Sequence, residues 1–245
     1  MRKYLEGFTH IKRNNLFNTE TVNIFCDASY KPNYNKASYG NIAIYQNSII
    51  YEDIRWHQAE DETINSLELK GIRSAVTTAF FVQRVLSEKA GHPVMINYIN
   101  IFSDSKYSID CIKRYLFDNV KWIWDYERGM YVKKYNGEKV PNQDLIIEVS
   151  NLIMKFQATF PNVVFDLWWC PAHEKLTSNL KVKHAGHRFA SINCKKPKNV
   201  KVEQGFVRYI CDSNDVIDNK VARKSNMYRP NKTKITDPIK FYYGP

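Results

Sequence analysis

Apolar and polar residues alternate along the first stretch of the chain that has a regular pattern. Residues 22–27 read Val-Asn-Ile-Phe-Cys-Asp, and this period of two predicts a β-strand. Asp27 falls inside the strand, where an unpaired ionised carboxylate is costly to bury. A divalent cation would offset that cost if other carboxylates converged on the same place.

The same kind of pattern predicts four further strands. Residues 37–45 and 49–56 follow the first strand closely, with turn-forming residues between them, and predict an antiparallel meander. Two more strands are predicted at 95–102 and 163–170. Each of these later strands follows a stretch with helical periodicity.

A period of 3.6 residues predicts helices at 66–87, 106–116, 145–160 and from 213 or 214 to about 225. In the first of these helices, Glu68 shares an apolar face with Ile72 and Ala75, so its carboxylate is expected to face the sheet. A second interpretation stays open. Asn65 and Glu68 also have the spacing of a capping box, in which the carboxylate only closes the start of the helix.

Acidic residues occur at or near the ends of four predicted elements. Asp27 lies in the first strand, Glu68 in the long helix, Asp104 directly after the fourth strand, and Asp218 in the last helix. Asp104 alone could be an ordinary helix N-cap. Local roles explain each acid separately, but they explain four acids at the element ends of one sheet much less readily.

The composition indicates a globular protein with a polyanionic partner. The chain has 245 residues, 14% aromatic residues and a net charge of +11, with a pI of about 9.3. A globular chain this basic favours nucleic acid as its partner, and an anionic membrane surface is the alternative. No apolar run approaches the ~20 residues that cross a bilayer, and the first residues lack a secretory signal.

The cysteines indicate a reducing compartment. There are five of them, an odd number, dispersed and without a C-x-x-C pair, which is untypical of a disulfide framework. We therefore expect a cytoplasmic protein. Cysteines and histidines crowd one basic stretch, but their spacing fits no standard zinc site; they are Cys170, His173, His184, His187, Cys194 and Cys211.

The pattern divides the chain into three parts. Residues 1–20 are expected to form an arm, residues 21–225 one domain, and residues 226–245 a basic C-terminal tail. Within the domain, residues from about 174 to 212 are basic and lack apolar periodicity, so we expect an irregular flap there instead of a second domain.

Four segments, in this order along the chain, resemble the motifs of the type 1 ribonuclease H family. They are Phe25-Cys26-Asp27-Ala28-Ser29, Thr63-Ile64-Asn65-Ser66-Leu67-Glu68-Leu69, Ile101-Phe102-Ser103-Asp104-Ser105-Lys106-Tyr107 and Asn214-Asp215-Val216-Ile217-Asp218. The resemblance covers roughly residues 21–173 and 212–225. It implies an α/β fold of the ribonuclease H type, with a five-stranded mixed sheet of three antiparallel and two parallel strands flanked by helices.

The resemblance also implies an activity, which is hydrolysis of the RNA strand of RNA–DNA hybrids by an endonuclease that leaves 5′-phosphate and 3′-hydroxyl ends. It makes Asp27, Glu68, Asp104 and Asp218 the metal ligands. It adds a catalytic histidine after the fifth strand, which is His173. His184 lies in a run similar to the family's histidine motif, but no strand is predicted before it.

Substrate contacts follow from the same resemblance. Thr63 and Asn65 would contact the duplex, with Asn65 able to read a 2′-hydroxyl. Trp122 and Trp124 open a basic, aromatic stretch that is similar to the family's substrate-handling protrusion. Lys106 stands where the family often has a polar amide, and could touch phosphate. The family usually reaches its last helix a few residues after the histidine, whereas this chain inserts about forty.

The donor set itself indicates the cofactor. Oxygen ligands select Mg²⁺ or Mn²⁺ over zinc, and two such ions can support phosphodiester hydrolysis. We expect two Mg²⁺ ions in the active complex, Mn²⁺ as a substitute, and a monomer without an obligate protein partner. Two other functions stay open: a DNA nuclease or transferase of the resolvase or integrase kind, and a non-catalytic nucleic-acid-binding module.

Overall fold

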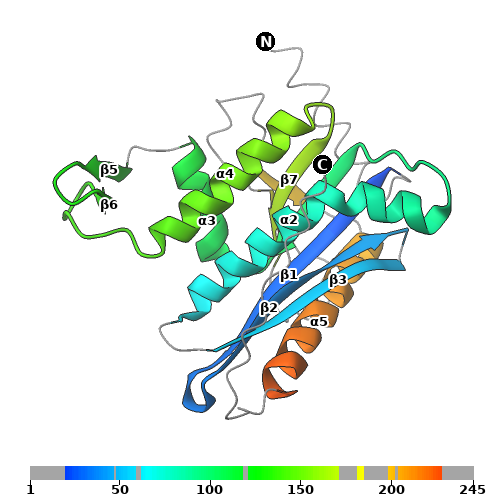
Figure 1. Cartoon of the computed structure of the whole chain (residues 1–245), viewed down its shortest axis with the longest axis horizontal. Coiled ribbons are helices and arrows are strands. Elements are labelled where there is room, and N and C mark those ends of the chain that lie inside the picture. The colour runs from blue at the N-terminus through cyan, green and yellow to red at the C-terminus, as the bar shows by residue number, and fades with distance from the viewer. Residues whose placement is uncertain are drawn as a thin grey trace.

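The computed structural model describes residues 20–46, 48–58, 62–117, 121–170, 181–184, 198–201 and 204–227. Its main element is a seven-stranded sheet with the strand order β3-β2-β1-β4-β7-β8-β9 (Figure 1). The strands of this sheet are β1 (Thr21–Lys31), β2 (Lys36–Tyr45), β3 (Ser48–Gln58), β4 (Tyr98–Ser103), β7 (Val164–Trp169), β8 (Lys181–His184) and β9 (Lys198–Lys201).

Five of these strands form the mixed sheet that the sequence predicts. β1 pairs antiparallel with β2, and β2 pairs antiparallel with β3. β1 pairs parallel with β4, and β4 pairs parallel with β7. The predicted fold class is therefore confirmed. Because β1 and β4 run parallel, Asp27, two residues beyond the last paired position of β1, and Asp104, directly after β4, are brought together.

Two further strands and a longer last helix correct the expectation of an irregular flap. β8 and β9 add an antiparallel pair beside β7, and α5 (Gln204–Met227) begins several residues before the predicted position. The sequence of β8 and β9 is short and rich in lysine, so it lacks apolar alternation. Lysine is typical of strands near a sheet edge, where backbone pairing and not burial holds the strand.

Helices cover both faces of the sheet (Figure 1). The helices α2 (Ile64–Ala90), α3 (Lys106–Phe117) and α4 (Gln143–Thr159) share one large core with alternate β1 residues such as Ile24. The opposite face meets α5, where Ser38 Oγ donates a hydrogen bond to the carbonyl of Val221.

Aromatic rings form a rigid layer across the three central strands. Phe25, Phe102 and Trp168 occupy paired positions on β1, β4 and β7. The rings of Phe25 and Phe102 stack with centroids 4.6 Å apart, and those of Phe102 and Trp168 lie 6.1 Å apart. This packing fixes the strands just before Asp27 and Asp104, so it limits how far those acids can move.

The basic, aromatic stretch after α3 is a two-stranded hairpin. β5 (Trp122–Asp125) pairs antiparallel with β6 (Met130–Lys133). The hairpin stands to one side of the main sheet, beyond α3 and α4 (Figure 1). Within the described residues, no helix is long and apolar enough to cross a membrane.

Candidate active site

Asp27 lies on β1, and Asp104 directly follows the neighbouring parallel strand β4. The pairing of β1 with β4 ends at Phe25 and Phe102, and continuing this register by two residues places Asp27 beside Asp104. Asp27 is 4% exposed, and its Oδ1 accepts a hydrogen bond of 2.7 Å from the backbone N–H of Ala28. The strand pairing therefore determines how close the two acids lie.

Glu68 approaches the same place from α2. A Cβ added to Gly71 would lie 3.2 Å from the carbonyl oxygen of Asp27, so the glycine allows α2 to lie directly against β1 at this point. Glu68 precedes Gly71 by three residues and shares its helix face. An isolated glycine inside a helical pattern is a signal of such close packing, and it is one that our reading of the sequence missed.

The capping interpretation of Glu68 is wrong. Thr63, and not Asn65, is the N-cap of α2: its side chain accepts from the backbone N–H of Ser66, and the Ser66 hydroxyl accepts from the backbone N–H of Thr63. Glu68 is 8% exposed, and its Oε2 is buried without a hydrogen-bond partner. A buried carboxylate oxygen without a hydrogen-bond partner is an atom that a bound cation or water can satisfy.

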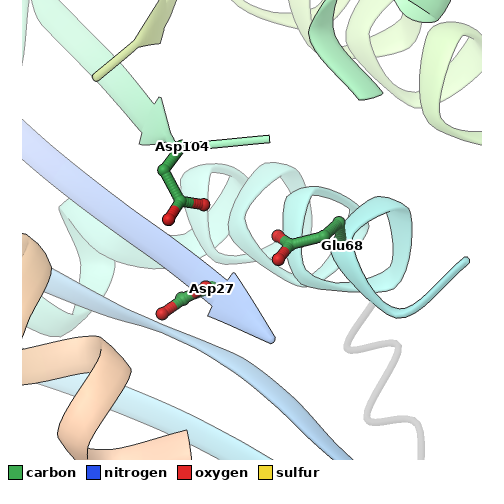
Figure 2. A group of neighbouring side chains, drawn as sticks. All are labelled: Asp27, Glu68 and Asp104. Atoms are coloured by element: carbon green, nitrogen blue, oxygen red, sulfur yellow. The ribbon is translucent and has the colours of Figure 1, made fainter. Parts of the chain in front are cut away.

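The capping interpretation of Asp104 fails in a similar way. The helix α3 begins at Lys106, and the hydroxyl of Ser105 accepts a hydrogen bond of 3.3 Å from the backbone N–H of Ser108. Ser105 therefore caps the helix. This leaves the Asp104 carboxylate directed toward the other acids (Figure 2).

Asp27, Glu68 and Asp104 converge on one point, each from a different element (Figure 2). One carboxylate oxygen of each residue lies within 4.8 Å of one oxygen of both others. Burial and the neighbouring charge of Asp104 raise the pKa of Asp27 to about 8. Burial and the charge of Asp27 raise the pKa of Glu68 well above its usual value. The carboxylates repel one another, and a cation would relieve that repulsion.

Asp218 reaches this group from α5. Its charge and its side-chain hydrogen bond to Asp27 both raise the pKa of Asp27, and its charge also acts on Glu68. Asp218 is not one of the three acids whose oxygens lie within 4.8 Å of one another. It is therefore a fourth carboxylate at the rim of the group.

The donor set fits a hard divalent cation. It consists of carboxylate oxygens, one of them buried and unpartnered, and it includes no thiol or imidazole. Such sets suit Mg²⁺ or Mn²⁺. Of the residues considered for zinc, Cys170 is a buried free thiol, and the side chains of the other five lie outside the described part of the chain.

The two candidate histidines, His173 and His184, both follow β7 in the sequence. His173 lies outside the described residues. The backbone before it is anchored at the site, because the N–H of Cys170 donates to the carbonyl of Ser103 at 3.0 Å. The backbone of His184 lies in β8 opposite Trp168, so the expectation that His184 has no strand of its own was wrong.

The predicted substrate-binding residues fall into two groups. Thr63 and Lys106 are exposed, and Asn65 is half-buried, all near the acids in sequence. Of the two tryptophans, Trp122 is 8% exposed and part of the core, whereas Trp124 is 42% exposed. Of the two tryptophans, only Trp124 is exposed enough to contact a substrate directly.

The fold and the acids together define a class of protein, an α/β protein with a cluster of carboxylates that could hold a cation beside two parallel strands. The family model for RNase H matches residues 19–189. The chain therefore belongs to the RNase H family. Family and fold support a nuclease that acts on RNA–DNA hybrids.

Solved structures with a similar arrangement include two RNase H domains. One is the N-terminal RNase H domain of rv2228c from Mycobacterium tuberculosis, solved as a fusion with maltose-binding protein. Its sequence is 13% identical to this chain and the TM-score is 0.38. The match covers 82% of this chain and 97% of that chain. The other is RNase H1 from the halophilic archaeon Halobacterium salinarum, with 13% identity and a TM-score of 0.35, covering 60% and 84%. No curated protein sequence matches the chain.

Proposed function

We propose that the protein is a metal-dependent endonuclease that cleaves the RNA strand of RNA–DNA hybrids and leaves 5′-phosphate and 3′-hydroxyl ends. The observation that carries this proposal is the convergence of Asp27, Glu68 and Asp104 at one point, with the Glu68 oxygen unpartnered. Membership of the RNase H family supplies the substrate class. We expect the enzyme to act as a monomer in the cytoplasm.

The acids hold the cations. Asp27 on β1 and Asp104 directly after β4 would hold the Mg²⁺ or Mn²⁺ ions. Glu68 supplies a ligand from the α2 side and Asp218 one from the α5 side. When bound, a pair of such ions activates a water molecule and stabilises the leaving 3′ oxygen of the scissile phosphodiester.

The chain's own residues position the substrate and move protons. His173, three residues beyond the anchored Cys170, is assigned to proton transfer or to product departure. The Thr63 hydroxyl accepts from the Ser66 N–H at 3.1 Å and donates to the Ser66 hydroxyl at 3.3 Å. To donate to a phosphate it would exchange this long second bond for one to the substrate. Asn65 can hydrogen-bond to a 2′-hydroxyl, the group that distinguishes RNA from DNA, and Lys106 can reach a phosphate.

The hairpin β5–β6 supplies a separate contact surface. Trp124 packs edge-to-face on Tyr131 with centroids 5.0 Å apart, which holds its exposed ring in place. Lysine and arginine are frequent in the hairpin and directly beside it in sequence, as expected for a surface that follows phosphates without reading sequence; they are Lys121, Arg128, Lys133, Lys134 and Lys139.

A panel of labelled duplexes tests the proposal. The purified protein is incubated with RNA–DNA hybrid, double-stranded RNA and double-stranded DNA, each with Mg²⁺, with Mn²⁺ and with EDTA. Cleavage restricted to the RNA strand of the hybrid, and abolished by EDTA, is the expected result. Cleavage or strand transfer of DNA alone would identify a resolvase- or integrase-like enzyme. Metal-independent binding without cleavage would identify a binding module.

A further inference from the structure

A hollow of about 490 Å³ lies between β3 and α5, on the sheet face opposite α2. Its lining is charged, with one aliphatic side chain among the charges; the lining residues are Glu52, Asp53, Ile54, Lys220, Arg223 and Lys224. Asp218 lies on the same helix, α5, as the three basic lining residues. The hollow, however, lies at β3, an edge strand of the sheet, and not at Asp27 and Asp104 on the β1–β4 side.

Cations are in excess in this hollow. Glu52 forms an ion pair with Lys220, and Asp53 pairs with Arg55 through two hydrogen bonds of 3.0 Å. Both acids are therefore neutralised by cations other than Arg223 and Lys224. Among the residues that the structure describes, neither Arg223 nor Lys224 forms an ion pair. A position in the last turn of α5 explains a cation at Lys224 through the helix dipole, but it does not explain the whole cluster.

An exposed indole lies on the same sheet face as these cations. Trp56 pairs with Ser38 across β3 and β2, and Ser38 in turn donates its hydroxyl hydrogen bond to the Val221 carbonyl of α5. Paired residues point to the same sheet face, so Trp56 lies on the α5 face, level with the turn of α5 that carries Arg223. The ring is 45% exposed, and it lies two residues beyond Ile54 of the lining.

We propose that this surface of Trp56, Arg223 and Lys224 binds single-stranded nucleic acid, with a base stacked on the indole and phosphates at the two cations. Aromatic rings beside cations match the repeat of base and phosphate, whereas an acidic peptide offers no base to stack. Ile54 lies in the same cross-strand row as Gly40 and Asp27, about 10 Å from Asp27 at two strand spacings. A strand that flanks the hybrid is therefore within reach. The inference rests on the proposed function only in taking nucleic acid as the ligand.

The test measures binding without hydrolysis. The anisotropy of a short labelled single-stranded DNA is followed in EDTA for the wild type and for three variants. Arg223→Glu combined with Lys224→Glu should weaken binding about tenfold or more, and should reduce the slope of log K against log salt by about one unit or more. Trp56→Ala should weaken binding at least about fivefold, and Trp56→Phe, which keeps an aromatic ring, should restore most of the loss.

A matched control separates a specific site from the general field of a basic protein. Arg84→Glu combined with Lys155→Glu makes the same change in net charge at exposed positions of α2 and α4. The proposal is overturned if this control weakens binding as much as the β3–α5 pair does, or if Trp56→Ala binds normally. It is also overturned if polyglutamate displaces the DNA and binds the hollow more tightly.

Two further measurements show whether the variants are folded and whether their active site is intact. Circular dichroism melts must show the variants folded; the Trp56 variants leave α5 intact and keep the test valid if the charge reversal disturbs the helix end. Cleavage of a short blunt hybrid should be unchanged in the Arg223 and Lys224 variant, since neither residue belongs to the active site. If the wild type binds the single strand as expected but cleaves no hybrid, the proposed function is wrong, whereas the proposal of a single-strand binding surface is retained.

Discussion

Asp27 and Glu68 are held in a place that disfavours their charge. Burial is the largest cause of the raised pKa in both, and the neighbouring carboxylates are the next. Among the described residues, the groups that shift the pKa of these two acids most are burial and other carboxylates, and none of them is a basic side chain. A site arranged in this way is destabilising until a cation arrives, and this is a frequent property of functional sites.

The free energy of unfolding of the cation-free protein should therefore fall as the pH rises. The pKa of Asp27 is raised from 3.8 to about 8, so the folded state binds this proton more tightly than the unfolded state. The contribution of protonated Asp27 to the free energy of unfolding is fully present below about pH 4 and is lost as the pH rises through about 8. Urea unfolding in EDTA should show a wild-type free energy that falls with pH by up to about 1.4 kcal/mol per unit more than that of Asp27→Asn.

Added Mg²⁺ supplies the control for this prediction. A cation that binds the ionised carboxylates should stabilise the wild type more at pH 8 than at pH 6, because fewer protons must be displaced. The same addition should have little effect on Asp27→Asn. Parallel curves for the two proteins in EDTA would show that Asp27 is ionised without a metal, contrary to this account.

At the scale of elements, the close contact between α2 and β1 sets the position of Glu68. Sequence periodicity predicted the helix and the face that carries Glu68. It did not predict which residue caps the helix, because Thr63, Asn65 and Ser66 all have side chains that can cap. Only the three-dimensional path of the chain decides among them.

Gly71→Ala tests the role of this contact. The new Cβ would lie 3.2 Å from the Asp27 carbonyl, so α2 must shift by a few tenths of an ångström. Alanine gains about 1 kcal/mol of helix propensity over glycine, so the free energy of unfolding should change little. Mg²⁺ affinity, measured by calorimetry, should fall several-fold. Gln83→Ala, at an exposed site on the same helix, is the control, and equal Mg²⁺ affinities in both variants would refute the role assigned to Gly71.

The end of β7 favours His173 over His184. Cys170 is fixed beside Ser103, and Trp169 Nε1 donates to the carbonyl of Asp104 at 2.9 Å. His173 follows three residues later. The backbone of His184 lies in β8, two strands from β4 and about 10 Å away.

His173→Ala should therefore slow turnover, by up to about 10²–10⁴-fold if the residue acts as an acid or base, with little change in hybrid affinity. His184→Ala should be nearly silent. Both are measured at saturating hybrid and fixed Mg²⁺. If His184→Ala slowed turnover more than His173→Ala, proton transfer would be assigned to His184 in β8 instead.

At the scale of the whole molecule, the sequence predicted the central sheet and its flanking helices, because each has a strong local pattern. The four acids were singled out by their order along the chain and by the resemblance to a family, not by any local pattern. The sequence did not predict β8 and β9, since short basic strands carry no apolar alternation and are specified by the neighbouring strand β7. It also could not place Asp218 relative to the other acids. That position depends on how α5 packs across the sheet, through contacts such as Ser38 with Val221.

The excess of positive charge should act mainly through phosphates. Replacing Lys195, Lys196 and Lys198 by alanine, in and beside β9, should reduce the slope of log K against log salt for hybrid binding by up to about three units. The Arg84 and Lys155 charge reversal described above shows how much of any change comes from net charge alone. An unchanged slope would mean that these lysines do not meet the substrate.

The most direct test of the central claim is the cleavage rate of a labelled RNA–DNA hybrid in Mg²⁺ by the wild type, Asp27→Asn and Asp104→Asn. The account predicts that each substitution abolishes cleavage, while hybrid affinity in EDTA stays close to that of the wild type and the unfolding midpoint does not fall. Wild-type rates in either variant, or a wild-type rate that persists in excess EDTA, would contradict it.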